Sequence, residues 1–107
     1  MEDMSVERMA ELLRAMGHPV RVKVIETLAE KDTCFCDMQA ALNLEQSSLS
    51  QHLQVLRRMR LVASRKGANQ TMYRLTNPHL PALLNAVRLA TEGGNQPDPE
   101  SQDELTQ

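Results

Sequence analysis

Residues 44–75 decide the fold of this chain, and they read LEQSSLSQHLQVLRRMRLVASRKGANQTMYRL. In the first half, leucines recur at the spacing of one helix face and predict an amphipathic helix that begins near Gln46. In the second half the period changes, since residues 61–65 and 71–75 have the pattern of two strands joined by a glycine-containing turn at 67–69. The stretch therefore predicts a helix followed directly by a β-hairpin.

Three further helices are predicted on the N-terminal side of this stretch. Apolar spacing predicts a first helix that ends at Gly17 and a second that begins at Pro19, since proline suits the first helical position. A short third helix is expected from about Cys34 to Leu42. Asn43 adopts the left-handed turn conformation more readily than most residues, so we expect a tight turn between the third and fourth helices.

The C-terminal side adds one more helix and a tail. Asn77-Pro78 is predicted to be a helix cap followed by a first-turn proline, and Gly93-Gly94 ends this helix. Residues 93–107 are polar, acidic and proline-bearing, a composition typical of disorder. We expect a winged helix-turn-helix domain over residues 1–92, mainly α with a β-hairpin in the order α-α-α-α-β-β-α. An acidic disordered tail is expected over residues 93–107.

The composition excludes several classes of protein. A chain of 107 residues forms one domain, and its two cysteines stand too close together for a disulfide framework. The N-terminus carries acids where a signal peptide carries bases, and no apolar run approaches the length of a membrane span. We expect a cytoplasmic protein with free thiols and no membrane partner. No nucleophile–base pair, phosphate loop or carboxylate dyad is recognisable, so we expect neither an enzyme nor a required cofactor.

Charge is distributed unevenly along the chain. The formal net charge is −2, yet residues 46–75 contain six basic side chains and no acidic one, whereas residues 93–107 contain four acidic side chains and no basic one. A contiguous basic stretch beside acidic flanks is typical of a surface that faces nucleic-acid phosphates. We therefore expect the stretch to bind double-stranded DNA, and residues 1–92 to form a DNA-binding domain.

The side chains expected to contact DNA lie on the fourth helix and the hairpin. The major groove is about 12 Å wide and admits a helix whose N-terminal end carries short or amide side chains. The candidates for base edges and phosphates at that end are Gln46, Ser47, Ser48, Ser50 and Gln51. The candidates for contacts with the DNA backbone are the arginines at the far end of the helix and the basic side chains at the hairpin tip, which are Arg57, Arg58, Arg60, Arg65 and Lys66.

The same region carries a resemblance to a known family. The chain resembles the ArsR/SmtB family of metal- and thiol-responsive bacterial repressors at residues 44–53, 55–57, 61–62 and 73–75, and His18-Pro19-Val20-Arg21 is similar to that family's Asp-Pro-Thr-Arg helix start. The resemblance implies a homodimer, built from the first and last helices, that represses an operon at a palindromic operator and is released by an inducer.

The resemblance also assigns roles to single residues. It implies that bases are read by Gln46, Ser47, Ser50 and Gln51. Glu45 stands where the family usually has Ser, and Gln51 stands where it often has His. The family's operator sequence therefore does not carry over to this chain.

A Cys-x-Cys pair stands at the head of the third predicted helix. Cys34-Phe35-Cys36-Asp37 resembles the Cys-Val-Cys-Asp motif of arsenic-responsive members, although Gln39 replaces the third cysteine that some relatives carry. Thiolates near a helix N-terminus are stabilised by its positive end, and sulfur ligands select soft ions. Three interpretations stay open for Cys34 and Cys36: arsenite or antimonite binding in arsenic resistance, oxidant or persulfide sensing, and buried cysteines or other metals.

Helix geometry constrains any ligand of this pair. Residues two apart on a regular helix point about 200° from one another, so one ion binds both sulfurs only if the first turn of the third helix unwinds. A zinc-type site between the last helices is not expected, because the family's ligand positions fall here on Asn77-Pro78-His79, Ala90 and Gly93. His18, His52 and His79 are expected to be helix-start, helix-face and surface histidines rather than ligands.

Two other classes of function compete with the repressor. A thiol-dependent reductase needs Cys-x-x-Cys spacing near a βαβ unit, and this chain has neither. A protein–protein adaptor can use the winged fold without DNA, and it differs from a repressor by having no specific operator.

Overall fold

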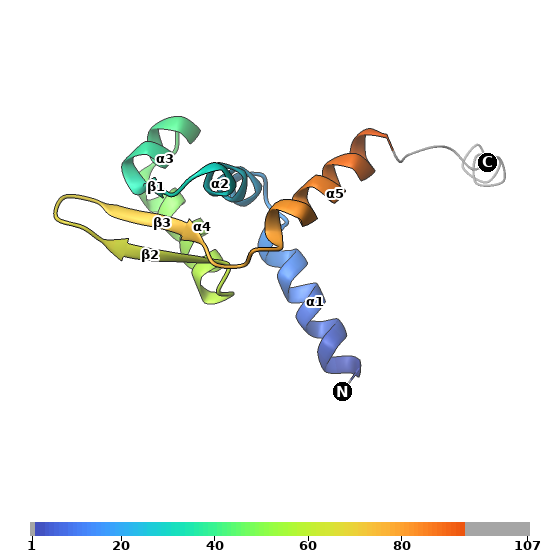
Figure 1. The fold of residues 1–107 in the computed structure, drawn as a ribbon. Helices are drawn as coiled ribbons and strands as arrows, with labels where there is room; N and C mark the ends of the chain where they lie inside the picture. The colour runs from blue at the N-terminus through green and yellow to red at the C-terminus, as the bar shows by residue number, and fades with distance from the viewer. Residues whose placement is uncertain (1, 94–107) are drawn as a thin grey trace.

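The structure is a computed structural model, and it describes residues 2–93. Its elements follow one another as α1 (Glu2–Met16), α2 (Pro19–Glu30), β1 (Thr33–Cys34), α3 (Phe35–Leu42), α4 (Gln46–Arg58), β2 (Val62–Lys66), β3 (Thr71–Leu75) and α5 (Leu80–Glu92). Figure 1 shows the β2–β3 hairpin extending to one side of the helices, while α1 and α5 project from the other side. The predicted fold class, a mainly α winged helix-turn-helix, is confirmed.

The turn between α3 and α4 has the predicted geometry. Asn43 has a φ of 55°, in the left-handed region that asparagine tolerates. The backbone N–H of Leu44 donates to the carbonyl of Gln39 at 3.2 Å and closes the end of α3. The chain therefore reverses within a few residues, and α4 leaves α3 as the second helix of a helix-turn-helix.

The sheet has one strand more than the sequence predicts. Its order is β1-β3-β2 with antiparallel pairing throughout, and Thr33 and Cys34 of β1 pair with Tyr73 and Met72 of β3. A strand of two residues is too short to show an alternating pattern, so sequence periodicity does not reveal it. Strand β1 attaches the start of α3 to the hairpin.

The core lies where the helices meet the sheet. The predicted apolar face of α4 is confirmed, because Leu49, Leu53 and Leu56 are each no more than 1% exposed. They belong to one cluster with buried residues of the other four helices, β2 and β3. Full burial of a leucine side chain contributes about 1.5–3 kcal/mol. One face of α4 thus packs against the core, and its polar face is exposed to solvent.

The start of α3 differs from the prediction. The helix begins at Phe35, because Cys34 has an extended backbone (φ −80°, ψ 160°) and belongs to β1. Cys34 is therefore the N-cap of α3 and not its first helical residue. Pairing of β1 with β3 holds Cys34 in this extended conformation.

The start of α5 also differs from the prediction. The helix begins at Leu80, and Pro81, not Pro78, is the proline of its first turn. The side-chain Oδ1 of Asn77 accepts a hydrogen bond from the backbone N–H of His79 at 2.9 Å and holds a separate turn before the helix. The tail predicted over residues 93–107 lies outside the described residues, apart from Gly93 at the C-cap of α5.

Candidate DNA-binding surface and thiol site

The N-terminal end of α4 presents polar side chains and backbone amides. Ser48 is half-buried, and the other predicted contacts at this end are exposed, namely Gln46, Ser47, Ser50 and Gln51. Glu45, the N-cap residue, makes no side-chain hydrogen bond to the helix. The first N–H groups of α4 therefore keep their capacity to donate, and such groups bind phosphate oxygens.

The C-terminal end of α4 is basic. Arg57 and Arg58 are exposed in its last turn, where the negative end of the helix dipole favours cations. Arg60 follows with a φ of 60°, and its carbonyl accepts a hydrogen bond from Thr76 Oγ1. Among the described side chains the ion pair found is Arg88 with Glu26, so none of these three arginines forms an ion pair with a described carboxylate. They remain available for phosphates.

The hairpin carries its two predicted basic side chains at the outer end of β2. Arg65 and Lys66 are both exposed there. The backbone N–H of Gly67 donates to the carbonyl of Gln70 at 2.7 Å and closes the turn. The tip is therefore a short, hydrogen-bonded loop with two cations at its base.

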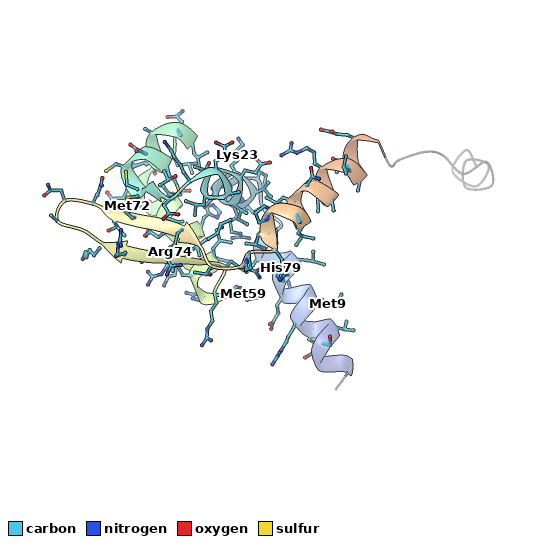
Figure 2. The ribbon with its side chains drawn as sticks, in the orientation of Figure 1. Met9, Lys23, Met59, Met72, Arg74 and His79 are labelled. Carbon is cyan, nitrogen blue, oxygen red and sulfur yellow. The ribbon has the colours of Figure 1, made fainter. Side chains whose placement is uncertain are left out.

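An acidic residue that sequence reasoning missed lies beside the hairpin. A hollow of about 300 Å³ is lined by Asp32, Ser64, Arg65, Met72, Tyr73 and Arg74. Figure 2 shows Met72 and Arg74 on β3. Asp32 directly precedes β1, and the pairing of β1 with β3 brings it to this hollow. Residues 46–75 contain no acid in the sequence, but the folded hairpin has one at its side.

The two cysteines differ in burial and in bonding. Cys34 is 6% exposed, and its Sγ accepts a hydrogen bond from the backbone N–H of Asp37 at 3.4 Å. Cys36 is exposed in the first turn of α3, and both thiols are free. Because Cys34 lies outside the helix, the expectation that both cysteines sit on one regular helical turn is wrong. A ligand shared by both sulfurs must instead compete with the hydrogen bond by which Cys34 caps α3.

No third metal ligand joins the two cysteines among the residues that the structure describes. Within residues 2–93 no group of three or more His, Cys, Asp or Glu side chains is placed to hold a metal ion. Phe35, between the two cysteines, packs near Tyr73 of β3 with ring centroids 6.4 Å apart. The candidate site therefore consists of two thiols, one at the end of β1 and one in the first turn of α3, beside the sheet.

A histidine cluster joins α2 to α4, and sequence reasoning did not predict it. The rings of His18 and His52 lie with centroids 4.3 Å apart, and Arg21 Nη1 lies 3.4 Å from His52 Nδ1. Burial, followed by the charges of His18 and Arg21, lowers the pKa of His52 below 6.5. Sequence spacing gives no signal for this meeting, because the residues come from separate helices.

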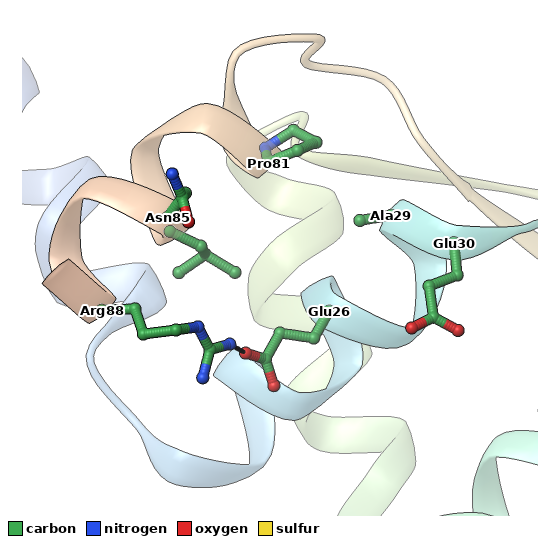
Figure 3. A pocket seen from close by; sticks show the side chains of 7 residues that line it. Glu26, Ala29, Glu30, Pro81, Asn85 and Arg88 are labelled. Atoms are coloured by element: carbon green, nitrogen blue, oxygen red, sulfur yellow. Dashed lines mark hydrogen bonds and ion pairs between the residues drawn. The ribbon is translucent and has the colours of Figure 1, made fainter.

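A hollow of about 380 Å³ lies between α2 and α5. Figure 3 shows Glu26 and Glu30 of α2 on one side, and Pro81, Asn85 and Arg88 of α5 on the other. Arg88 donates to Glu26 across the hollow in a half-exposed ion pair. Exposed pairs of this kind contribute at most about 1 kcal/mol. The ion pair links α5 to α2 at this hollow.

Both α1 and α5 expose large apolar side chains. On α1 the exposed side chains include Val6, Met9 and Leu13, at 63%, 60% and 57% exposure. On α5 they include Val87 and Leu89, at 46% and 59%. Figure 1 shows both helices projecting away from the hairpin, and Figure 2 shows Met9 on α1. Within the described range, no helix is both long and apolar enough to cross a membrane.

The chain matches the model of a family described as bacterial regulatory protein, arsR family, over residues 18–64. It is 33% identical to a transcriptional repressor SmtB homolog of Synechocystis, across 76% of this chain and 61% of that protein. The chain thus spans less than two thirds of that relative's length.

Two solved structures have the same fold. BigR, a transcriptional repressor from Xylella fastidiosa, is 35% identical with a TM-score of 0.74, covering 89% of this chain and 97% of that chain. Reduced HlyU from Vibrio cholerae is 30% identical with a TM-score of 0.74, covering 84% and 93%. The relatives and the fold are those of DNA-binding transcriptional regulators, so the prediction that the chain is not an enzyme is confirmed.

Proposed function

Because this chain belongs to the ArsR family of bacterial regulatory proteins, we propose that it is a transcriptional repressor that binds a palindromic operator as a homodimer in the cytoplasm. The observation that carries the proposal is the exposed polar N-terminal end of α4. It is followed by arginines that form no ion pair with any described carboxylate. The relatives named as repressors in Synechocystis and Xylella fastidiosa support it.

The contacts with DNA divide into three parts. The N-terminal end of α4 enters the major groove, where Gln46, Ser47, Ser50 and Gln51 reach base edges or phosphates. The half-buried Ser48 contributes through a phosphate at most. The basic side chains contact the DNA backbone. Arg57 and Arg58 do so from the C-terminal end of α4, and Arg65 and Lys66 do so from the hairpin.

Dimerisation is proposed through α1 and α5. Val6, Met9 and Leu13 follow the i, i+3, i+7 spacing of one helix face and are all more than half exposed. A contiguous apolar face of this kind marks an interaction site in a soluble protein. A two-fold dimer pairs two α4 helices about 34–36 Å apart, the spacing of one DNA turn.

The test is a selection of binding sites from a random double-stranded DNA library, followed by affinity measurements at about 0.15 M salt. The expected result is a two-fold symmetric sequence that is bound at least about 10³-fold more tightly than unrelated DNA. Failure to enrich any symmetric sequence would contradict the proposal and favour the protein–protein adaptor.

For the inducer, we propose arsenite or antimonite bound by Cys34 and Cys36. Arsenite is As(OH)₃, and each thiol forms one As–S bond while its proton leaves with a hydroxyl group as water. Two such steps consume two thiols and release two waters without oxidation or reduction. The third arsenic position keeps its hydroxyl or takes an outside thiol, since the described residues near the pair add no further thiol.

The contrast between the two cysteines gives this capture an order. Cys36 is exposed and reacts first. Cys34 is buried and caps α3, so it binds the ion only after its hydrogen bond from Asp37 breaks. Formation of the second As–S bond therefore removes the N-terminal capping bond of α3. Because α3 supports α4 through a tight turn, the spacing of the two α4 helices changes and the operator is released.

A second candidate inducer is an oxidant or a persulfide acting on the same cysteines. The observation in its favour is that one similar structure, from Vibrio cholerae, is described as reduced HlyU. The two inducers are separated by adding arsenite or hydrogen peroxide to the operator complex and then a reductant. Release by arsenite under reducing conditions supports the metalloid. Release by peroxide alone, reversed by the reductant, supports the oxidant.

A further inference from the structure

The geometry points to a proton-sensitive joint, formed by His18, Arg21 and His52, that fixes the start of α2 against the DNA-binding helix α4. His18 is the N-cap of α2, Arg21 lies one turn into that helix, and His52 is at the middle of α4. All three side chains are half-buried. Acidification is inferred to loosen the joint and to weaken operator binding.

The hydrogen bonds of the joint require both histidine rings to be neutral. His18 Nδ1 accepts the backbone N–H of Val20 at 3.1 Å, which is the capping bond of α2. His52 Nδ1 lies 3.4 Å from Arg21 Nη1, and a guanidinium is only a donor, so His52 must accept there. A proton on either Nδ1 turns the acceptor into a donor and removes the bond.

The charges around the joint also oppose protonation of His52. Arg21 Nη2 donates to the carbonyl of Arg14 on α1, and its Nε is buried without a partner among the described residues. The adjoining hollow between α1, α2 and α4 contains the charged groups Glu11, Arg14, Arg21 and Arg58. One carboxylate thus faces three guanidinium groups. Two imidazolium rings 4.3 Å apart would add to an already positive cluster.

The direction of the pH effect follows from His52. Burial, then His18 and Arg21, lower the pKa of His52 in the folded protein below 6.5, its value in the unfolded chain. Between the two values the unfolded chain binds more protons. The contribution of the joint to stability is therefore complete above pH 6.5 and is lost as the pH falls through the lowered pKa.

The test uses a double variant that keeps the acceptors and removes the titration. His18→Asn with His52→Asn places an amide oxygen near each Nδ1 position, and Asn is a preferred N-cap. His79→Asn is the matched control, because His79 is exposed and lies outside the joint. Urea unfolding is measured at about pH 7.5 and about pH 5.5 for the wild type and both variants.

On acidification, the unfolding equilibrium constants of the wild type and of His79→Asn are expected to rise at least about threefold more than that of the double variant. Equal rises in all three proteins would overturn the inference. Should the double variant not fold, an NMR titration of the wild type decides, and a His52 midpoint at or above 6.5 would overturn it. Neither measurement uses DNA, so a failure of the proposed repressor function leaves this result readable.

The link to α4 is tested on the selected operator. Between the same two pH values the wild type is expected to lose at least about threefold more operator affinity than the double variant. Parallel changes in the two proteins would overturn the link between the joint and DNA binding.

Discussion

The thiol of Cys34 accepts a hydrogen bond from the backbone N–H of Asp37 at 3.4 Å, and in this way it caps α3. The residue stands at the junction of the sheet and the helix-turn-helix, because it also pairs through β1 with Met72 of β3. Cys36, two positions later, is exposed. Before any ligand binds, one thiol thus maintains the start of a helix and the other is open to solvent.

Replacing either cysteine by serine is expected to keep operator binding and abolish release by arsenite. Serine is a favoured N-cap, so Cys34→Ser retains the start of α3, but a hydroxyl does not replace the thiolate as a soft ligand. The measurement is operator affinity with and without arsenite. The wild type should lose about 5–150-fold in affinity. A variant released as readily as the wild type would end the cysteine-sensing proposal.

Gln51 and Arg65 are expected to affect DNA binding in different ways. Gln51→Ala should reduce discrimination at one base pair by about 1–3 kcal/mol, because a base-edge contact is lost. Arg65→Ala should weaken binding about equally on all sequences, since it removes a phosphate contact. Affinities for the selected operator and for single-base variants of it check this. Lys23→Ala, which removes an exposed lysine on α2, is the control and should change neither quantity.

Operator affinity is expected to depend strongly on salt. If about four of the six basic side chains in residues 46–75 of each protomer contact phosphates, the dimer neutralises about eight phosphate charges. The logarithm of the affinity then falls against the logarithm of the salt concentration with a slope of about −7. Affinity titrations over a series of salt concentrations give the slope directly. A slope near zero would remove α4 and the hairpin from the DNA interface.

The proposed dimer face is expected to be sensitive to charge. Met9→Asp and Leu13→Asp should each convert a dimer to a monomer in sedimentation, because a carboxylate in an apolar interface loses its hydration. Both side chains are more than half exposed in the protomer, so the fold itself should be retained. Lys23→Glu serves as the control and should leave the dimer intact. A wild-type protein that sediments as a monomer at micromolar concentration would count against the interface.

The residues that sequence reasoning located are those whose signal is local. Leu49, Leu53 and Leu56 repeat at helix spacing, and all three are buried as that spacing requires. Asn43 takes the left-handed conformation because its own backbone preference permits it. The exposed polar residues at the start of α4 follow from the same repeat, because a helix that buries one face exposes the other.

What the sequence determined by itself was therefore the helix-turn-helix, the hairpin and their basic character, since helix and strand periods and turn preferences act within a few residues. Only the tertiary structure decided that Cys34 caps α3 from strand β1, that Asp32 lies beside the hairpin arginines, and that His18 meets His52. Each of these depends on pairing or packing between segments that are distant in the chain. Such contacts arise when the core closes, and they leave no period in the sequence.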